Sequence, residues 1–208
     1  MTTQTRATQK ELTPAAALTL LSEGNVRFQS GSMLTRDLVE QVGVTAKAQF
    51  PFAVILSCID SRVSAELIFD QGLGDVCSAR IAGNVLNDDI LGSMEFACQL
   101  AGSKLIVVVG HSACGAVRGA CDGAELGHLT GLLQKIEPAI EAVAASGQAR
   151  DDDFVLRVAE RNVEHVAREI RERSSVLDAL IAKGEVGIVS AMYSVQTGKV
   201  VFGDLSCG

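Results

Sequence analysis

Short apolar runs alternate with longer segments of mixed polarity along most of this chain. Three such runs lie at 52–57, 76–82 and 104–110, and a helix-like segment at 90–100 separates the second run from the third. Strand and helix alternating at this spacing predict a parallel sheet with helical crossovers. Two further runs, 187–193 and 199–204, flank Gln196-Thr197-Gly198, which predicts a hairpin turn. We therefore expect an α/β protein with a central, mostly parallel sheet flanked by helices.

The remaining segments have helical patterns. A helix is expected over 15–30, because Thr13-Pro14 supplies a cap and a first-turn residue and Gly31 can end it. Further helices are expected at 36–48, 116–121, 129–145 and 154–181. The chain length fits one domain spanning residues 1–208. Within it, residues 1–50 form an N-terminal helical arm and residues 51–208 form an α/β core with C-terminal helices and strands.

Composition narrows the class of protein. The chain is 48% hydrophobic but only 4% aromatic, so its core must be mainly aliphatic. A net charge of −7 argues against a nucleic-acid surface. We find no run of apolar residues that could span a membrane and no apolar signal-peptide region, so we expect a cytoplasmic protein. In that compartment, six cysteines are more typical of thiols or metal ligands than of disulfides.

The first candidate site is AVILSCIDSR, residues 53–62. An apolar strand ends here with Cys58, Asp60 and Arg62 at alternate positions. Residues two apart share a face in an extended chain. Burying these three side chains together is costly unless something binds them.

The second candidate site is KLIVVVGHSACGAVRGA, residues 104–120, where ligand-type residues follow another apolar strand. His111 and Cys114 share a face if a helix begins there. Ligands of parallel sheets bind beyond the carboxyl ends of the strands, so Cys58, Asp60, His111 and Cys114 converge if the two strands are neighbours. Thiolate, imidazole and carboxylate are ligands for zinc, and Arg62 can offset the negative charge by pairing with Asp60.

Each of these residues also has a structural interpretation. A single buried cysteine commonly behaves as a small hydrophobic residue, and Asp60 with Arg62 could be a structural ion pair. Four ligand-type residues at two strand ends together favour the metal site.

With these motifs in place, the sequence resembles the β-class carbonic anhydrases over roughly residues 18–205. The matching motifs are GNVRF at 24–28, SCIDSRV at 57–63, IFDQGLGDV at 68–76, RIAGN at 80–84 and GHSACGAV at 110–117. The resemblance implies one zinc ion per subunit, held by Cys58, His111 and Cys114, with Asp60 and Arg62 as a catalytic dyad. It also implies a central sheet of four parallel strands plus an added strand. The active site is implied to lie at the interface of a homodimer, or of a dimer of dimers, whose N-terminal helices pack on the partner.

The implied reaction is the reversible hydration of carbon dioxide to bicarbonate and a proton. Zinc lowers the pKa of a bound water to about 7, which yields hydroxide at neutral pH. Asp60 on the zinc would close the site as a fourth ligand, whereas Asp60 on Arg62 would open it. The dyad is therefore expected to gate the metal.

The resemblance also assigns a substrate pocket. Gln49 and Gly115 match family positions that hydrogen-bond the substrate. Cys77 and Phe96 match wall positions at which many members carry Phe and Tyr, and Ala82 matches one at which plant-type members carry Val. The smaller Cys77 and Ala82 would widen the apolar wall.

Two other functions stay open at this point. Zinc hydrolases of carbonyl sulfide or carbon disulfide share this metal set, and the altered wall at Cys77 and Ala82 is compatible with them. A non-catalytic zinc module is the other alternative. The Asp60–Arg62 pair argues against it, because a structural zinc needs no replaceable fourth ligand.

Overall fold

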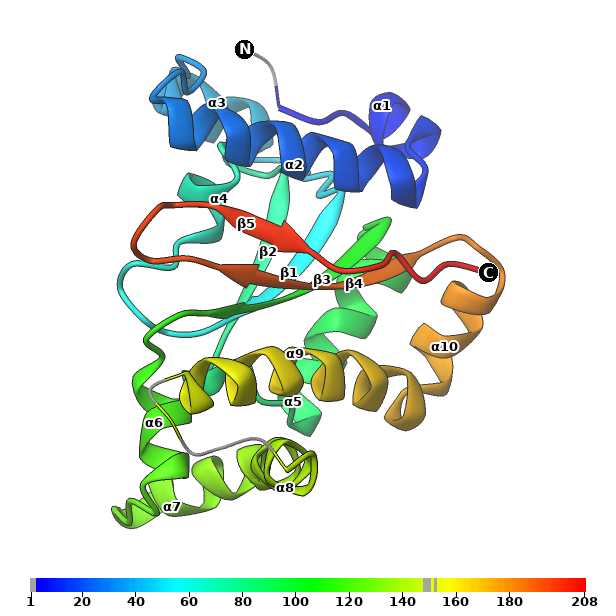
Figure 1. Ribbon diagram of the computed structural model, residues 1–208. Coiled ribbons are helices and arrows are strands. Elements are labelled where there is room, and N and C mark those ends of the chain that lie inside the picture. Colours follow the sequence, from blue (N-terminus) through cyan, green and yellow to red (C-terminus); the bar gives the residue numbers. More distant parts are fainter. Residues whose placement is uncertain (1–2, 148–150, 152) are drawn as a thin grey trace.

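The computed structural model describes residues 3–147, 151 and 153–208 (Figure 1). Five strands in this part of the chain form one sheet in the order β2-β1-β3-β4-β5. Their bounds are β1 Ala53–Ser57, β2 Val76–Arg80, β3 Leu105–His111, β4 Gly187–Tyr193 and β5 Val200–Phe202. The first four strands of that order are parallel, and β5 is antiparallel to β4. The predicted fold class is confirmed.

Helices precede, connect and follow these strands. Their bounds are α1 Arg6–Glu11, α2 Pro14–Ser30, α3 Leu38–Thr45, α4 Ala65–Ile68, α5 Asp88–Glu95, α6 Gly115–Cys121, α7 Gly127–Leu133, α8 Glu137–Ala145, α9 Phe154–Arg173 and α10 Ser175–Ala182. Short turns of other helical types are η1 Ala82–Asn84, η2 Phe96–Leu100 and η3 Gln134–Ile136. No helix among the described residues is both long and apolar enough to cross a membrane.

Several helix boundaries differ from those expected. The segment predicted as one helix over 154–181 is two helices, because Ser174 leaves the helical conformation and its side chain accepts the Leu177 N–H to cap α10. The segment 129–145 is likewise divided into α7, η3 and α8, with Pro138 in the first turn of α8. Helix α1 was not predicted, because its six residues, RATQKE, show no periodic apolar face.

Helices cover both faces of the sheet. Alternate residues of β1 and β3, such as Ile55 and Val107, pack toward α2, while Leu56 and Val108 pack in the cluster formed with α5, α9 and α10. Figure 1 shows α2 on one side of the sheet and α9 on the other. Burial of both faces explains why these strands read as continuous apolar runs.

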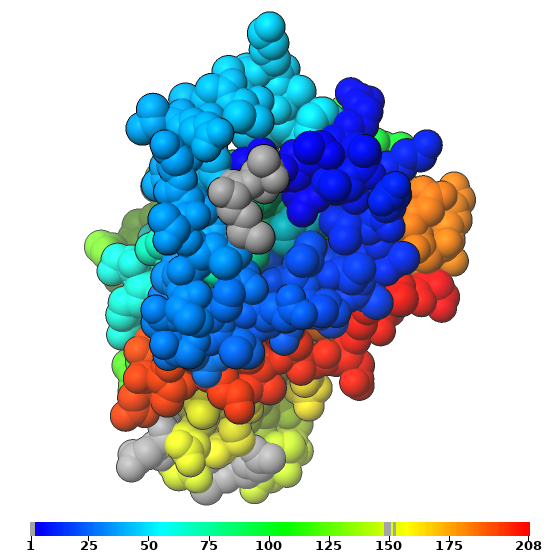
Figure 2. Space-filling view, turned by 90° about the horizontal axis from the view of Figure 1, so that it is seen from above, coloured from blue at the N-terminus to red at the C-terminus, as the bar shows by residue number. Residues whose placement is uncertain are grey.

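The N-terminal helices dock on the core of their own subunit. A Cβ atom at Gly24 would lie 1.8 Å from the Phe69 carbonyl oxygen, so only glycine allows this close approach of α2. Beside it, buried Asn25 donates to the carbonyl oxygens of Ile68 and Gly198, both at 2.9 Å. Seen from above, α1–α3, coloured blue, cover much of this face of the molecule (Figure 2).

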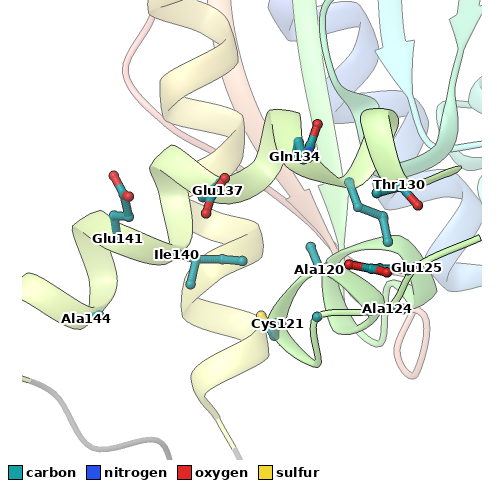
Figure 3. A pocket seen from close by; sticks show the side chains of 12 residues that line it. Ala120, Cys121, Ala124, Glu125, Thr130, Gln134, Glu137, Ile140, Glu141 and Ala144 are labelled. Carbon is teal, nitrogen blue, oxygen red and sulfur yellow. The ribbon is translucent and has the colours of Figure 1, made fainter. Parts of the chain in front are cut away.

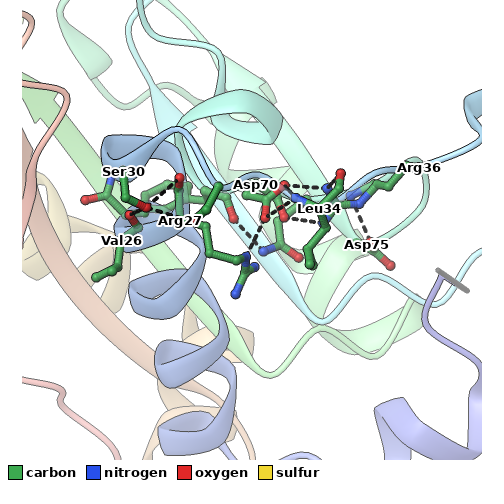
Figure 4. A network of polar contacts seen from close by, with 12 residues as sticks. Val26, Arg27, Ser30, Leu34, Arg36, Asp70 and Asp75 are labelled. Atoms are coloured by element: carbon green, nitrogen blue, oxygen red, sulfur yellow. Dashed lines mark hydrogen bonds and ion pairs between the residues drawn. The ribbon is translucent and has the colours of Figure 1, made fainter.

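An ion-pair cluster around Asp70 completes the docking (Figure 4). The Asp70 side chain is fully buried and pairs with Arg27 of α2 and with Arg36, just before α3. It also accepts the Leu34 N–H at 3.3 Å. Burial raises the pKa of the Asp70 carboxyl, but these donors outweigh it and hold the pKa below its usual range.

Replacing Asp70 by Asn should lower the free energy of unfolding by about 3 kcal/mol at pH 7, because two guanidinium groups lose their partly buried counter-charge. The carboxylate's contribution is fully present above its unfolded-state pKa of about 4 and is lost as the pH falls through its lower native pKa. The gap between wild type and variant should therefore shrink in acid. Urea denaturation at several pH values measures it.

A matched control is Asp178→Asn, which removes a carboxylate that pairs with Arg171 at the surface. Exposed pairs of this kind contribute at most about 1 kcal/mol. Equal losses in the two variants would contradict the role assigned to Asp70.

Candidate metal centre

The two predicted half-sites meet at one edge of the sheet. Cys58 follows β1 directly, His111 is the last residue of β3, and Cys114 directly precedes α6. Since β1 and β3 are parallel neighbours, with Ser57 opposite Val109, their carboxyl ends lie side by side. The three residues are 4%, 0% and 2% exposed, and their ligand atoms all lie within 4.8 Å of one another.

The geometry of this group fits zinc. The two sulfur atoms are 4.0 Å apart, close to the about 3.8 Å that tetrahedral zinc with Zn–S bonds of about 2.3 Å requires. His111 Nδ1 lies 2.9 Å from the Ser112 carbonyl oxygen, which only accepts, so Nδ1 carries the proton. The lone pair is therefore on Nε2, which is buried without a hydrogen-bond partner among the described residues. A bound cation would satisfy it.

The two thiols influence each other's ionisation. The Cys114 thiol lowers the pKa of Cys58 to about 4; burial opposes this, and His111 and the backbone N–H groups of Asp60 and Gly83 add to it. The pKa of Cys114 is raised, because a second sulfur cannot readily ionise beside the first and burial acts in the same direction. Binding of a divalent cation would remove this conflict and release a proton.

Asp60 lies on Arg62 rather than in the ligand group. Arg62 Nε donates to Oδ1 at 2.9 Å, Nη2 donates to Oδ2 at 2.7 Å, and the Arg62 backbone N–H also binds Oδ1. These hydrogen bonds hold the pKa of Asp60 well below its usual range. The structure thus has Asp60 in the open arrangement, and its role as a fourth metal ligand stays a prediction.

The contact between Asp60 and Arg62 forms differently from what strand alternation suggests. The chain leaves β1 after Ser57, and the Val63 N–H binds the Asp60 carbonyl oxygen at 3.0 Å, which closes a turn. Arg62 therefore comes back to Asp60 around this turn, and the two side chains do not share the face of a strand. Because of this turn, the two charged side chains are not buried inside the sheet, where they would lower stability.

Two residues outside the predicted site support the ligand loop. Arg80, at the end of β2, donates to the carbonyl oxygens of Cys58 and Asp60 at 3.1 and 2.7 Å. Gly83 donates its backbone N–H to the Cys58 sulfur at 3.4 Å. The signal available in the sequence was the RIAGN motif after an apolar strand, with a glycine where the chain must turn.

The predicted substrate positions are divided between different parts of the molecule. Gly115 directly follows Cys114, and Ala82 belongs to η1, whose Gly83 contacts the Cys58 sulfur. Cys77 and Phe96 instead line a hollow together with Asp88 and other residues of α5. Their substrate roles stay predictions.

Gln49 lies at the opposite end of the sheet. It precedes β1 and lines a hollow with Thr45 and Gly74, whereas Cys58 follows the same strand. Five residues of extended strand span roughly 16 Å, so Gln49 does not reach the metal group of its own subunit.

A separate hollow of about 500 Å³ lies between α6 and the segment formed by η3 and α8 (Figure 3). Its lining combines the apolar residues Ala120, Leu133 and Ile140 with the carboxylates Glu125, Glu137 and Glu141. None of the predicted site residues is among the described residues that line it.

Comparisons with known proteins agree with the resemblance seen in the sequence. Residues 53–200 match the family described as "Carbonic anhydrase". The chain is 37% identical over 198 residues to carbonic anhydrase 2 of Mycobacterium tuberculosis, an alignment that covers 92% of this chain and 93% of that protein.

Solved structures show the same fold. The β-carbonic anhydrase CafA of Aspergillus fumigatus is 28% identical, with a TM-score of 0.72 over 91% of this chain and 90% of its own. A structure from work on two tetrameric β-carbonic anhydrases of Sordaria macrospora is 25% identical, with a TM-score of 0.71 over 78% of this chain and 85% of its own.

Replacing Cys58 by Ser or His111 by Ala should lower zinc content from one ion per subunit to a small fraction. A hydroxyl does not replace a thiolate as a zinc ligand, and alanine supplies no ligand atom. The measurement is metal analysis after dialysis against a mild chelator. Cys77→Ser is the matched control, because that half-buried thiol lies outside the ligand group. Full zinc content in Cys58→Ser would contradict the ligand assignment.

Proposed function

The chain belongs to the β-class carbonic anhydrases, and we propose that Cys58, His111 and Cys114 hold its zinc ion while Asp60 and Arg62 serve the reaction beside it. The protein is a zinc lyase that hydrates carbon dioxide reversibly to bicarbonate and a proton. The residue roles below make up the proposal.

The observation that carries the proposal is the placement of the Asp60 carboxylate on Arg62. The group of Cys58, His111 and Cys114 then supplies three ligands and leaves a fourth position open, which is typical of catalytic rather than structural zinc. Zinc, when bound, supplies a Lewis acid that lowers the pKa of a water molecule at that open position.

Asp60 orients the attacking water. Its carboxylate stays ionised because of the hydrogen bonds from Arg62, so it can only accept hydrogen bonds. Two carboxylate oxygens offer about four lone-pair positions, and the side chain and backbone of Arg62 use three of them. The remaining position can accept a hydrogen bond from the water and direct the water's lone pair toward the carbon of carbon dioxide. The half-exposed Arg62 guanidinium attracts the bicarbonate anion.

The same pair gates the metal. If Asp60 leaves Arg62 and turns toward the three ligands, its carboxylate fills the open position and excludes water. Arg62 competes for that carboxylate through two parallel hydrogen bonds, a geometry that is among the stronger ion pairs in proteins. The balance between these two contacts sets the fraction of open sites.

A second copy of the chain completes the site in this proposal. Leu38, Val39 and Val42 of α3 are 55%, 83% and 58% exposed, and a cluster of large apolar side chains on one short helix favours an interface. Gln49 lines a hollow that also includes Val42, so a partner that covers α3 would meet Gln49 as well. The tetrameric relatives from Sordaria macrospora support self-association. A homodimer, or a dimer of dimers, would bring Gln49 of one subunit to the metal group of the other.

A cytoplasmic location belongs to the same proposal. Cys58, Cys77, Cys98, Cys114 and Cys207 are not in disulfides, as is typical of proteins in a reducing compartment. Thiols in that compartment stay available as metal ligands.

Replacing Asp60 by Asn should lower kcat for carbon dioxide hydration by about 100-fold, the size of effect typical of a positioned proton acceptor. Zinc content should not change, because the ligands are intact. Stopped-flow hydration assays with zinc quantified in each sample measure both, and Asp178→Asn is the matched surface control. A zinc-loaded Asp60→Asn protein with wild-type turnover would refute the role of Asp60.

Subunit mixing tests whether Gln49 acts across the interface. Gln49→Ala and Cys58→Ser subunits should each be nearly inactive, but their mixed dimers contain one site with an intact metal group and the partner's Gln49. Random pairing in a two-fold dimer makes half the dimers mixed, so activity should recover to about a quarter of wild type. No recovery in verified mixed dimers would contradict this arrangement, as would full activity of Gln49→Ala alone.

A further inference from the structure

A buried amide lies directly behind the metal group. Asn162 is the polar residue among the buried side chains of α9, which are otherwise apolar, and it is fully buried. Its Nδ2 donates to the Gly83 carbonyl oxygen at 3.0 Å, while its Oδ1 has no hydrogen-bond partner among the described residues. Burying an unpaired amide oxygen lowers stability, so an apolar residue would serve the packing of this helix better. Features that break a packing rule in this way are expected near functional sites.

Gly83 connects this amide to the metal group. Its carbonyl oxygen accepts from Asn162, and its N–H donates to the Cys58 sulfur at 3.4 Å. The residue has φ 67°, a conformation that favours glycine. A Cβ atom here would also lie 2.9 Å from Ile136 Cδ1. Hydrogen bonds therefore restrain Gly83 from both sides, Asn162 on one and Cys58 on the other.

The position of α9 is itself set by close packing. A Cβ atom at Gly110 would lie 2.6 Å from Val163 Cγ1 and 2.8 Å from Met192 Sδ, so glycine lets α9 approach the end of β3. Val163 is the neighbour of Asn162 in the chain. The same approach brings the Asn162 amide within reach of the Gly83 turn, although the two residues are 79 positions apart.

We propose that Asn162 is a positioning residue of the zinc site, which fixes the Gly83 turn so that its N–H points at the Cys58 sulfur and tunes the bond of that sulfur to the metal. An N–H donor draws electron density from a thiolate and holds it in one orientation. Groups that orient metal ligands in this way typically change metal affinity by about 10- to 100-fold when they are removed. The inference rests on the proposed role of Cys58 as a zinc ligand.

The test replaces zinc by Co²⁺, whose thiolate-to-metal charge-transfer absorption reports the sulfur ligands directly. In Asn162→Ala the Gly83 N–H is no longer fixed on the sulfur, so the Cys58 thiolate becomes more electron-rich. The charge-transfer band should therefore move to longer wavelength. Competition with a chelator should show zinc affinity about 10- to 100-fold weaker than wild type.

Val166→Ala is the matched control, since it truncates another buried residue one turn further along α9. The Val166 side chain packs in the cluster with residues of α5 and α10, whereas Cys58 and Cys114 belong to a different cluster. It should destabilise the protein but leave the cobalt band and zinc affinity unchanged. If Asn162→Ala does not fold, Asn162→Leu replaces it, because leucine keeps the side chain's branched shape and approximate size, has no donor for the Gly83 carbonyl and introduces no buried charge. A folded Asn162 variant with the wild-type band and affinity overturns the inference, and so does a band shift of equal size in Val166→Ala.

The design separates this inference from the ligand assignment. Wild-type protein without any thiolate-to-cobalt band would show that the proposed ligand set is wrong. A wild-type band that disappears in Cys58→Ser, together with an unchanged band in Asn162→Ala, would leave the ligand set standing and reject only the role of Asn162.

Discussion

Two sulfur atoms and one imidazole lone pair are buried together where the carboxyl ends of β1 and β3 meet, and the rest of the structure follows from that constraint. Without a cation only one sulfur is readily ionised, and the His111 Nε2 atom has no partner among the described residues. A divalent cation resolves both conflicts, so metal binding and folding stability are linked at this edge of the sheet. The sheet order that makes β1 and β3 neighbours is therefore the topological requirement for the chemistry.

The five sequence motifs that carry the resemblance to the family serve two physical purposes. The SCIDSRV, RIAGN and GHSACGAV segments contain the candidate metal ligands, the Asp60–Arg62 pair and the N–H group that donates to the Cys58 sulfur. The GNVRF and IFDQGLGDV segments contain no metal ligand. Gly24 allows α2 to approach the core, and Arg27 pairs with Asp70, so these segments dock the N-terminal helices. Docking places α3 and Gln49 on the surface, where a second copy can meet them.

The strands and the grouping of the two cysteines with the histidine were predictable because both have strong local signals. A continuous apolar run marks a strand buried on both faces, and cysteine and histidine just after such runs mark a ligand site. Helix boundaries were less predictable where a single residue decides them, as Ser174 does between α9 and α10. The strand-alternation argument brought Asp60 and Arg62 together for the wrong geometric reason, since a turn rather than an extended strand joins them. Helix α1 was not predicted, because its sequence has no apolar residues at helical spacing.

The sequence by itself determined the class of fold and indicated Cys58, His111 and Cys114 as candidate metal ligands, because apolar runs and the ligand-type residues that follow them are local signals. It also indicated that Asp60 pairs with Arg62, because the two residues are only two positions apart. Only the tertiary structure decided that Gly83 donates to Cys58, that Asn162 restrains Gly83 from 79 positions away, and that Gln49 lies at the far end of the sheet from the ligands of its own subunit. Such contacts depend on how α9 and η1 pack against β1 and β3. Close packing, set by glycines such as Gly110, selects them without leaving any local pattern along the chain.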